Sequence, residues 1–382
     1  MISISRNNNR TSPERYLDVI YEINAKENLS FIGGDIDSDI RTINSKTKFF
    51  NSKCSFVDKA IFLPYLHNYH IPNDRFHEFL AYDENLVPLF NANQYKTVIK
   101  GYKDHPQIPL SINASPKIRH IGGLSYYMGL FNPHFGHALI EVLSRAWFFL
   151  KSKHLLCSDL KFVFHTFKTP SKAPSPDVFL GKIGEYLKLL NIRKEQIIFI
   201  DQPTEFENII IPEIAISISD GDCFFDSRFL DVYSELNEKI IGFEKTSSKP
   251  VYISRAKWAK PVQGRGLLNE AEVEECFRKK GFEIIYPEVT ETKRLHALLK
   301  TAPIVAGVPG SGLLNSIFSQ NNSLNIAIVN KSMMIHNPGF NHFLHMNNMK
   351  QSSTVAYVHE GDDKMSFNVD IKNMSLCLKN VI

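Results

Sequence analysis

The sequence predicts an α/β protein with two domains, and two observations carry this prediction. The chain has 382 residues, which exceeds the usual size of one hydrophobic core and suits two domains. In its second half, short β-branched or aromatic runs alternate with segments of helical period, a pattern typical of a mostly parallel sheet. The composition, 43% hydrophobic and 22% charged, is that of a globular protein.

The first domain is expected to span residues 1–244. Its first 120 residues contain short apolar runs, such as 60–66 and 97–99, that form no clear pattern. A central apolar helix follows, starting near Gly136. Further elements are then predicted from period and residue type: strands at 162–167, 197–200 and 209–218, and helices at 178–190 and 228–243. Residues 244–250, EKTSSKP, form a linker.

Residues 245–345 are predicted to form a Rossmann-like unit in which strands and helices alternate. The strands are 251–254, 283–286, 304–308 and 325–329, and the helices are 270–280, 292–300 and 313–319. Asn269, with Glu272 three residues later, matches an N-terminal capping pattern, and Gly281 matches a C-terminal stop. The tail, 346–382, carries no motif, and its packing against the first domain is left open.

Charge and cysteine content exclude several classes of protein. The net charge is +4 without a dense Lys/Arg run, so nucleic acid is not an expected partner. No apolar window reaches the roughly 18 residues of a membrane span, which predicts a cytoplasmic protein, with peripheral association with the inner membrane left open. The five cysteines are scattered without CxxC spacing, which argues against disulfides and structural zinc.

The stretch 132–147, NPHFGHALIEVLSRAW, places His137 and Glu141 four residues apart on an otherwise apolar helix. Residues at this spacing are neighbours, roughly 5 to 6 Å apart at Cβ. Buried ionisable groups are costly unless paired, and they tend to occur where chemistry is carried out. Ser144 and Arg145 extend the polar stripe. A core histidine stabilised by a glutamate explains the same pattern equally well.

Two predicted strand ends carry groups suited to an anion. In doubly wound sheets ligands bind beyond the carboxyl ends of the strands. Strand 304–308 leads into Gly310-Ser311-Gly312, whose backbone N–H groups can approach a phosphate. Strand 251–254 leads into four basic residues: Arg255, Lys257, Lys260 and Arg265. Each feature alone is often only a tight turn or a solvated loop, but together they predict a nucleotide or phosphosugar site.

The ordered motifs resemble those of glycosyltransferase family 61, over about residues 115–335. The motifs are Gly136-His137 with Glu141, YISR with Arg265, Asn269-Glu270, GFEIIYPE and VAGVPGSGLLNSIF. The resemblance implies a GT-B fold, two Rossmann-like domains facing a central cleft, and inverting transfer from a nucleotide sugar without a bound metal or cofactor. Bacterial members of this family sit among capsule and lipopolysaccharide genes, which implies a glycan or lipid-linked oligosaccharide as acceptor.

Position by position, the resemblance implies that Arg255 and Arg265 form the basic pair after the first strand. It places Gly310, Ser311, Gly312 and Asn315 in the family's HGAGLxN loop. Two residues depart from the family pattern. Pro309 replaces the histidine of the loop, and Ala327 stands where an acidic residue usually follows the last strand. These departures bear on the identity of the donor and not on the fold.

The hypothesis is therefore a metal-independent glycosyltransferase. A base must take the proton of the acceptor hydroxyl, and positive groups must stabilise the leaving diphosphate. His137 and Glu141 are the expected catalytic dyad, with either able to take the proton. The groups expected to hold the donor are Arg255, Lys257, Arg265, Gly310, Ser311, Gly312 and Asn315.

Three alternatives stay open. The acidic pairs Asp35/Asp37, Asp37/Asp39 and Asp220/Asp222 match a metal-binding DxD pattern, although such clusters are more often turns. The chain could instead transfer another group, such as pyruvyl or phosphoryl, to a glycan. A third reading is a non-catalytic glycan-binding protein of an assembly complex, which Pro309 and Ala327 favour.

Overall fold

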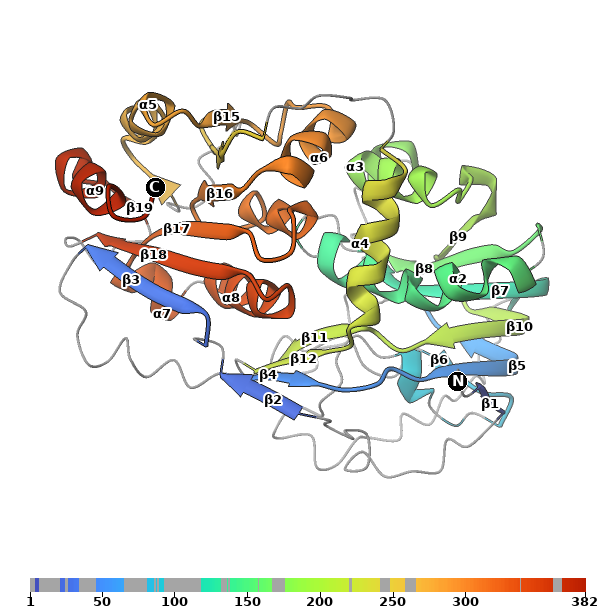
Figure 1. Cartoon of the computed structure of the whole chain (residues 1–382). Coiled ribbons are helices and arrows are strands. Elements are labelled where there is room, and N and C mark those ends of the chain that lie inside the picture. The colour runs from blue at the N-terminus through green and yellow to red at the C-terminus, as the bar shows by residue number, and fades with distance from the viewer. Residues whose placement is uncertain are drawn as a thin grey trace. The chain divides into compact units, whose positions relative to one another are not determined.

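The computed structural model describes most of the chain. The described residues are 4–6, 21–24, 27–33, 46–64, 81–85, 87, 89–92, 118–131, 136, 138–156, 158–166, 176–219, 222–240, 248–257, 266–336, 338–359 and 366–382. They form α-helices and both parallel and antiparallel strands (Figure 1). The predicted α/β class is therefore confirmed.

The chain divides into two compact units. Unit 1 consists of Met1–Tyr21 and Lys48–Val232, and unit 2 consists of Glu22–Thr47 and Tyr233–Ile382. The chain passes from one unit to the other within β2, β4 and α4, which span Tyr21–Asn24, Lys46–Phe49 and Arg228–Glu238. The expected first domain, residues 1–244, included residues 22–47. The structure instead groups Glu22–Thr47 with the C-terminal part of the chain.

Unit 1 is built on a mixed sheet in the order β1-β5-β10-β7-β8-β9, with β6 paired to β5. The strands are β1 Ile4–Arg6, β5 Cys54–Phe62, β6 Ala81–Tyr82, β7 Arg119–Phe131, β8 Lys161–Thr166, β9 Ile197–Ile200 and β10 Thr204–Pro212. Neighbours among β10, β7, β8 and β9 are parallel, whereas β5 runs antiparallel to β10 and β6. β1 pairs in parallel with β5, so β5 is antiparallel only to β10 and β6.

Several predicted elements of unit 1 are confirmed, and one strand is wrong. The runs 162–167 and 197–200 correspond to β8 and β9. The helices 178–190 and 228–243 correspond to α3, Pro176–Leu189, and α4, which ends at Glu238. The run 209–218 is two strands, β10 and β11 Ile216–Ser219, because the chain turns after Pro212. β11 then pairs antiparallel with β12, Asp222–Phe225.

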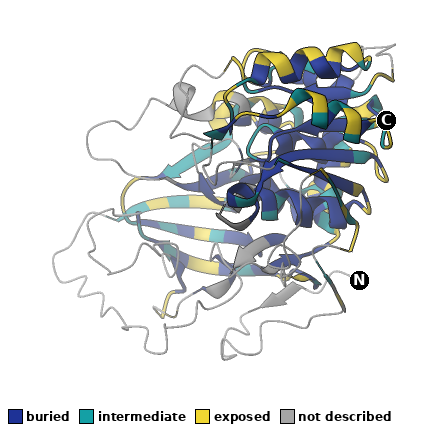
Figure 2. Ribbon diagram, turned by 90° about the vertical axis from the view of Figure 1, so that its left-hand side faces the viewer, coloured by how far each residue is buried: buried dark blue, intermediate teal, exposed yellow. Residues whose placement is uncertain are grey.

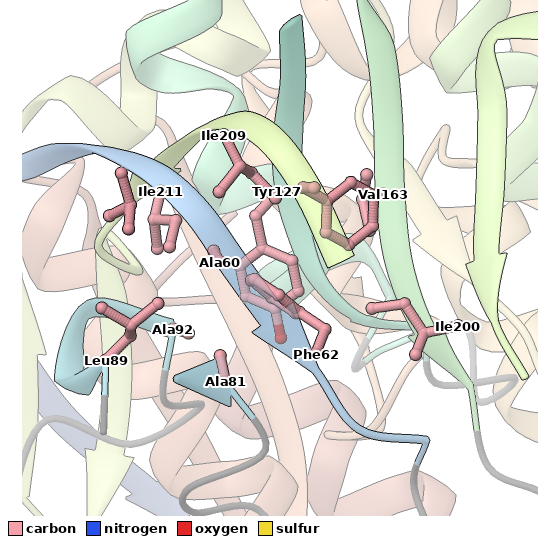
Figure 3. Close-up of a cluster of buried hydrophobic side chains, with 12 residues drawn as sticks. Ala60, Phe62, Ala81, Leu89, Ala92, Tyr127, Val163, Ile200, Ile209 and Ile211 are labelled. Carbon is pink, nitrogen blue, oxygen red and sulfur yellow. The ribbon is translucent and has the colours of Figure 1, made fainter. Parts of the chain in front are cut away.

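A hydrophobic core of unit 1 forms where side chains of the sheet strands β5, β7, β8, β9 and β10 pack with those of β6 and of the segment 89–92 (Figure 3). Its buried side chains are Val57, Ala60, Phe62, Ala81, Leu89, Ala92, Tyr127, Val163, Ile200, Phe206, Ile209 and Ile211. Exposed or half-buried positions separate these side chains along β5 and the first half of β10 (Figure 2). Two such positions stand between Val57 and Ala60, and two between Phe206 and Ile209, so the simple alternation of a strand with one buried face is interrupted in both.

Unit 2 contains a six-stranded parallel sheet in the order β15-β13-β16-β17-β18-β3. The strands are β13 Val251–Ile253, β15 Glu283–Ile285, β16 Ile304–Gly307, β17 Leu324–Asn330, β18 Ser353–His359 and β3 Leu29–Gly33. All four strands predicted in this region are present. The predicted alternation of parallel strands and helices is therefore present, and the sheet is larger than expected because β18 and β3 extend it.

The helices of unit 2 alternate with these strands (Figure 1). They are α5 Glu270–Lys279, α6 Thr292–Thr301, α7 Lys331–His336, α8 Pro338–Met349 and α9 Ile371–Leu378. A 3-10 helix, η9 Leu313–Phe318, stands where a helix over 313–319 was expected. Within the described ranges, no helix is both long and apolar enough to cross a membrane.

The ends of α5 show one correct and one incorrect prediction. Gly281 follows the helix with φ +86°, as a C-terminal stop requires. Asn269 does not cap the helix with its side chain. Its amide instead bonds both backbone groups of Val369, at 2.9 Å each. The tail thus docks on unit 2, where β19, Ser366–Phe367, pairs with β14, Gly266–Leu267.

Candidate functional site

The segment that carries Glu141 changes its helical geometry twice. Ala138–Val142 form a π-helical turn, Leu143–Arg145 form a 3-10 turn, and the α-helix α2 spans Ala146–Ser152. Glu141 is half-buried. Six of the apolar side chains expected to be buried are so: Leu139, Ile140, Val142, Leu143, Ala146 and Trp147. The expected regular α-helix is wrong. π-Helical turns are rare, and they occur often at functional sites.

His137, the other member of the expected dyad, lies outside the described residues. The distance between the His137 and Glu141 side chains therefore stays a prediction, as does the choice between a catalytic and a core histidine.

Arg145 corrects the expectation of a polar stripe beside Glu141, because its side chain points into the core. It is fully buried. Nη1 donates to Asn91 O at 2.9 Å and to Pro212 O, and Nη2 donates to Ala92 O at 3.3 Å. Burial lowers the pKa of Arg145, and the carbonyls partly replace lost water. Arg145 therefore anchors the segment and does not face a substrate.

Trp147 gives a second anchor in the same segment. Its Nε1 donates to Glu213 O at 2.9 Å, and the Arg228 guanidinium lies 4.0 Å from its ring centroid. Arg228 Nε in turn donates to Asp226 Oδ1 at 2.8 Å. Burial alone would raise the pKa of Asp226, but hydrogen bonds from Arg228 and from Ser52 N–H hold it below its usual value. The indole is therefore fixed by a charged pair and by backbone.

In unit 2, the predicted anion site lies at the topological switch point of the sheet. β13 and β16 are parallel neighbours, and Ile253 lies opposite Gly307. From β13 the chain continues to β15 on one side, and from β16 it continues to β17 on the other. Such a divergence opens a crevice beyond the carboxyl ends of the strands, where ligands bind in open α/β sheets.

Arg255 and Gly310 meet at this switch point. A Cβ atom placed on Gly310 would lie 3.3 Å from Arg255 Nη1, so the guanidinium crosses over the glycine. The φ angle of Gly310 is +153°, a conformation that disfavours other residues. Gly307 permits close strand packing, because a Cβ there would lie 2.8 Å from Ile253 O. The structure thus places Arg255, the first residue of the predicted basic loop, beside the glycine loop.

Two buried carboxylates of α5 bind the end of β13 and the start of the loop that carries Arg255. Glu270 Oε1 accepts from Tyr252 OH at 2.8 Å and from Arg255 N–H at 3.3 Å. Glu274 Oε1 accepts from Ser254 Oγ at 2.6 Å. Burial raises the pKa of Glu270, although its hydrogen bonds oppose that rise. These glutamates fix the backbone that presents Arg255.

The other expected donor residues take different positions. Lys257 is exposed, with Nζ 5.7 Å from the Tyr286 ring centroid, while Ser311 and Gly312 are half-buried. Asn315 is buried, and its Nδ2 donates to Gly312 O at 2.8 Å and Ser311 O at 3.4 Å. Asn315 therefore stabilises the glycine loop by donating to two of the loop's carbonyl oxygens. Arg265 and Lys260 lie outside the described residues.

Ala327, which departs from the family pattern, does not bear on the expected ribose contact. Ala327 lies inside β17, opposite Gly307, and is fully buried. The end of this strand is Asn330, so Ala327 does not occupy a position after the strand where a ribose contact is expected. Pro309 is buried within the glycine loop, so its departure from the family pattern still bears on the donor site.

Lys350 lies behind η9, the 3-10 helix that follows the glycine loop. Its Nζ donates to Ser316 O at 2.6 Å, Ser319 O at 2.8 Å and Ser319 Oγ at 2.7 Å. The side chain is buried, and none of the ion pairs between described residues includes it. Burial lowers the pKa of Lys350 to about 7.

This shift predicts a pH-dependent stability. The folded-state pKa lies below the value of about 10.4 expected in an unfolded chain, so unfolding takes up a proton between these values. The free energy of unfolding should then rise with pH above 7, by at most about 1.4 kcal/mol per pH unit, and this gain is lost as pH falls.

We expect the difference in melting temperature, wild type minus Lys350→Met, to increase between pH 7 and 9. Lys279→Met, at an exposed position of α5, is the control and should show no such change. Parallel pH profiles for the wild type and Lys350→Met would contradict the assignment.

The metal alternative gains no support from the described part of the chain. No group of three His, Cys, Asp or Glu residues among the described positions is arranged to hold a metal ion. Asp222 lies in β12, and Asp35, Asp37, Asp39 and Asp220 lie outside the described residues.

Sequence reasoning missed the supports of both sites. The pair Glu270 and Glu274, spaced by four residues on a predicted helix after a basic loop, was the signal available for unit 2. For the Glu141 segment the support comes from the buried side chain of Arg145. Arg145 was misread because a charged residue on a helix is usually exposed.

Comparison with known proteins gives one match. A family model described as Glycosyltransferase 61 matches residues 135–326, about half of the chain. The matched region begins beside Gly136, includes Glu141, Arg255 and the glycine loop, and ends within β17. None of the curated proteins compared with the chain matches it.

Proposed function

The chain is a member of the glycosyltransferase 61 family, and from this premise we propose that it moves a sugar from a nucleotide-sugar donor to a glycan acceptor. The observation that carries the proposal is the position of Arg255 over Gly310 at the switch point of the unit 2 sheet. A guanidinium beside a glycine loop suits a diphosphate, because it offers charged donors where backbone N–H groups can also approach the anion.

The proposed reaction is an inverting displacement. The acceptor hydroxyl oxygen attacks the anomeric carbon, the bond from that carbon to the diphosphate oxygen breaks, and the diphosphate leaves with the electron pair. The hydroxyl proton passes to the dyad of His137 and Glu141. A positioned base of this kind is effective when its pKa lies near the ambient pH.

Positive groups of unit 2 stabilise the charge that develops on the leaving diphosphate. Arg255 has the central role, Arg265 and Lys257 supply further charge, and Gly310–Gly312 supply backbone N–H groups. The proposal assigns this role to protein cations and requires no metal. It also requires that the Glu141 segment and the Arg255 loop face one another across a GT-B cleft.

The wider setting belongs to the proposal as well. The acceptor is a growing glycan or a lipid-linked oligosaccharide of capsule or lipopolysaccharide synthesis, and the protein acts in the cytoplasm, with peripheral binding to the inner membrane. A non-catalytic glycan-binding protein is the second candidate, and the buried Pro309 in place of the histidine of the loop favours it.

A thermal-shift panel of nucleotide sugars tests the proposal directly. A ligand at 100 times its Kd stabilises the folded state by about 2.7 kcal/mol, so a true donor should raise the melting temperature by several degrees. The same donor should be hydrolysed or transferred by the wild type. Binding without any turnover would favour the glycan-binding alternative, and no binding to any member of the panel would contradict the donor site.

A further inference from the structure

Strand β7 carries two neighbouring tyrosines that serve opposite faces of the sheet. Tyr127 lies in the core of unit 1 (Figure 3), and its hydroxyl pairs with His165 Nδ1 at 2.8 Å. Tyr126 is also fully buried, and its hydroxyl donates to Arg145 O at 2.6 Å and accepts from Phe149 N–H at 2.9 Å. Successive strand residues alternate in this way.

Both contacts of the Tyr126 hydroxyl are with backbone groups in the first turn of α2. Arg145 O and Phe149 N are four residues apart, which is the pair that an α-helix links directly. The hydroxyl therefore bridges the first turn of α2, where the 3-10 turn gives way to α geometry. Only a group that both donates and accepts can make this bridge. Burial raises the pKa of Tyr126 well above its usual range, so the phenol keeps the proton that it donates.

A second contact connects this turn to Glu141. Ser144 Oγ donates to Glu141 O at 2.8 Å, across the junction of the π-helical and 3-10 turns. These turns have poorer hydrogen-bond geometry than an α-helix and persist where other contacts hold them. Arg145 supplies such contacts from its side chain, and Tyr126 supplies them at its carbonyl.

We propose that Tyr126 is a positioning residue for Glu141: its hydroxyl, bound to Arg145 O and Phe149 N–H, fixes the irregular turns and thereby sets the direction of the Glu141 carboxylate. The inference rests on the proposed function, in which this carboxylate belongs to the dyad that takes the acceptor proton. Without the bridge, the irregular turns over residues 138–145 lose one of the contacts that hold them, so they open more readily and Glu141 turns relative to β7.

Tyr126→Phe tests the proposal against a matched control, Tyr127→Phe. Each removes one buried hydroxyl and its hydrogen bonds from β7, so both variants should lower the melting temperature by a similar amount. Amide hydrogen exchange over residues 138–152 and steady-state kinetics are measured on the full chain. We expect faster exchange there in Tyr126→Phe alone. A displacement near 1 Å can cost about 10²-fold in rate, so we expect kcat to fall by about 10-fold to 100-fold, with the donor KM nearly unchanged.

The outcomes separate the inference from the proposed function. Equal exchange over residues 138–152 in the two variants overturns the inference, and so does an equal kcat. A wild type without turnover on any donor overturns the proposed function, and the exchange result then decides whether Tyr126 fixes the segment.

If Tyr126→Phe does not fold, a second pair of variants decides. Ser144→Ala removes the bond to Glu141 O, and Ser152→Ala removes an equivalent bond to Phe148 O at 2.6 Å in α2. Only the first should lower kcat. Equal kcat values for Ser144→Ala and Ser152→Ala would overturn the inference.

Discussion

Replacing Glu141 with Gln is expected to lower turnover by about 10² to 10⁴, the usual cost of losing a positioned acid or base. The amide keeps the size of the side chain and most of its hydrogen-bonding capacity, but it removes the charge on which the dyad depends. Because Glu141 is only half-buried, the melting temperature should change little. The measurement is kcat with saturating donor and acceptor.

Glu205→Gln is the matched control, since Glu205 also pairs with a histidine in unit 1. Its Oε1 lies 3.0 Å from His120 Nδ1, and the pair is at the surface. This variant should retain wild-type turnover. His137→Ala should match the loss seen in Glu141→Gln, and the double variant should be little worse than the worse single, as for residues that act as a unit.

A different result would identify a structural pair. If His137 and Glu141 only stabilise the core, both substitutions should lower the melting temperature, and activity should return when the assay is cooled. Full turnover in Glu141→Gln would remove Glu141 from the mechanism and leave His137 to act alone.

Replacing Arg255 with Ala is expected to weaken donor binding by about 1.5 to 3 kcal/mol, the range for a hydrogen bond to a charged group. That loss corresponds to a Kd about 10 to 150 times higher. Isothermal titration with the donor found in the thermal-shift panel measures it. The fold should be retained, because Arg255 is half-buried at a strand end and Glu270 still accepts from the backbone N–H at that position.

Arg294→Ala controls for the loss of one positive charge from unit 2. Arg294 lies on α6, its side chain is 63% exposed, and its nearest acidic partner is Glu283 at 3.7 Å. Donor affinity should be unchanged in this variant. An equal loss of affinity in both variants would mean that Arg255 acts only through the net charge, and an unchanged Kd in Arg255→Ala would contradict the donor site.

The parallel sheet of unit 2 and the loops at its strand ends were largely predictable from the sequence, because this part of the structure is local. The elements of this region follow one another along the chain in the order β13, α5, β15, α6, β16, η9 and β17. Hydrophobic periodicity, together with the turn and capping residues, is therefore enough to define each of them. The meeting of Arg255 with Gly310 then follows from the rule that parallel strands point the same way.

The segment around Glu141 in unit 1 was less predictable, because its geometry is set by distant contacts. The π-helical and 3-10 turns around Glu141 depend on Arg145 reaching Asn91, Ala92 and Pro212, and no local pattern reports such contacts. β7 was missed because Gly122, Gly123 and Gly129 interrupt it, and glycine usually weakens a strand.

The pairing of β3 with β18 has a consequence for biosynthesis. Ser30 Oγ bonds Thr354 O across a separation of 324 residues, and Gly33 packs so closely that a Cβ there would lie 2.7 Å from Val358 O. At a synthesis rate of about 5 to 20 residues per second, β3 waits roughly 16 to 65 s for its partner. Until β18 is synthesised, the sheet of unit 2 is incomplete and the backbone groups of β3 lack their partner strand. An unpaired strand edge favours association with other chains. The nascent chain therefore has a long period in which chaperone protection of β3 would favour correct folding. A fragment that begins after residue 233 would leave β18 as an open edge permanently.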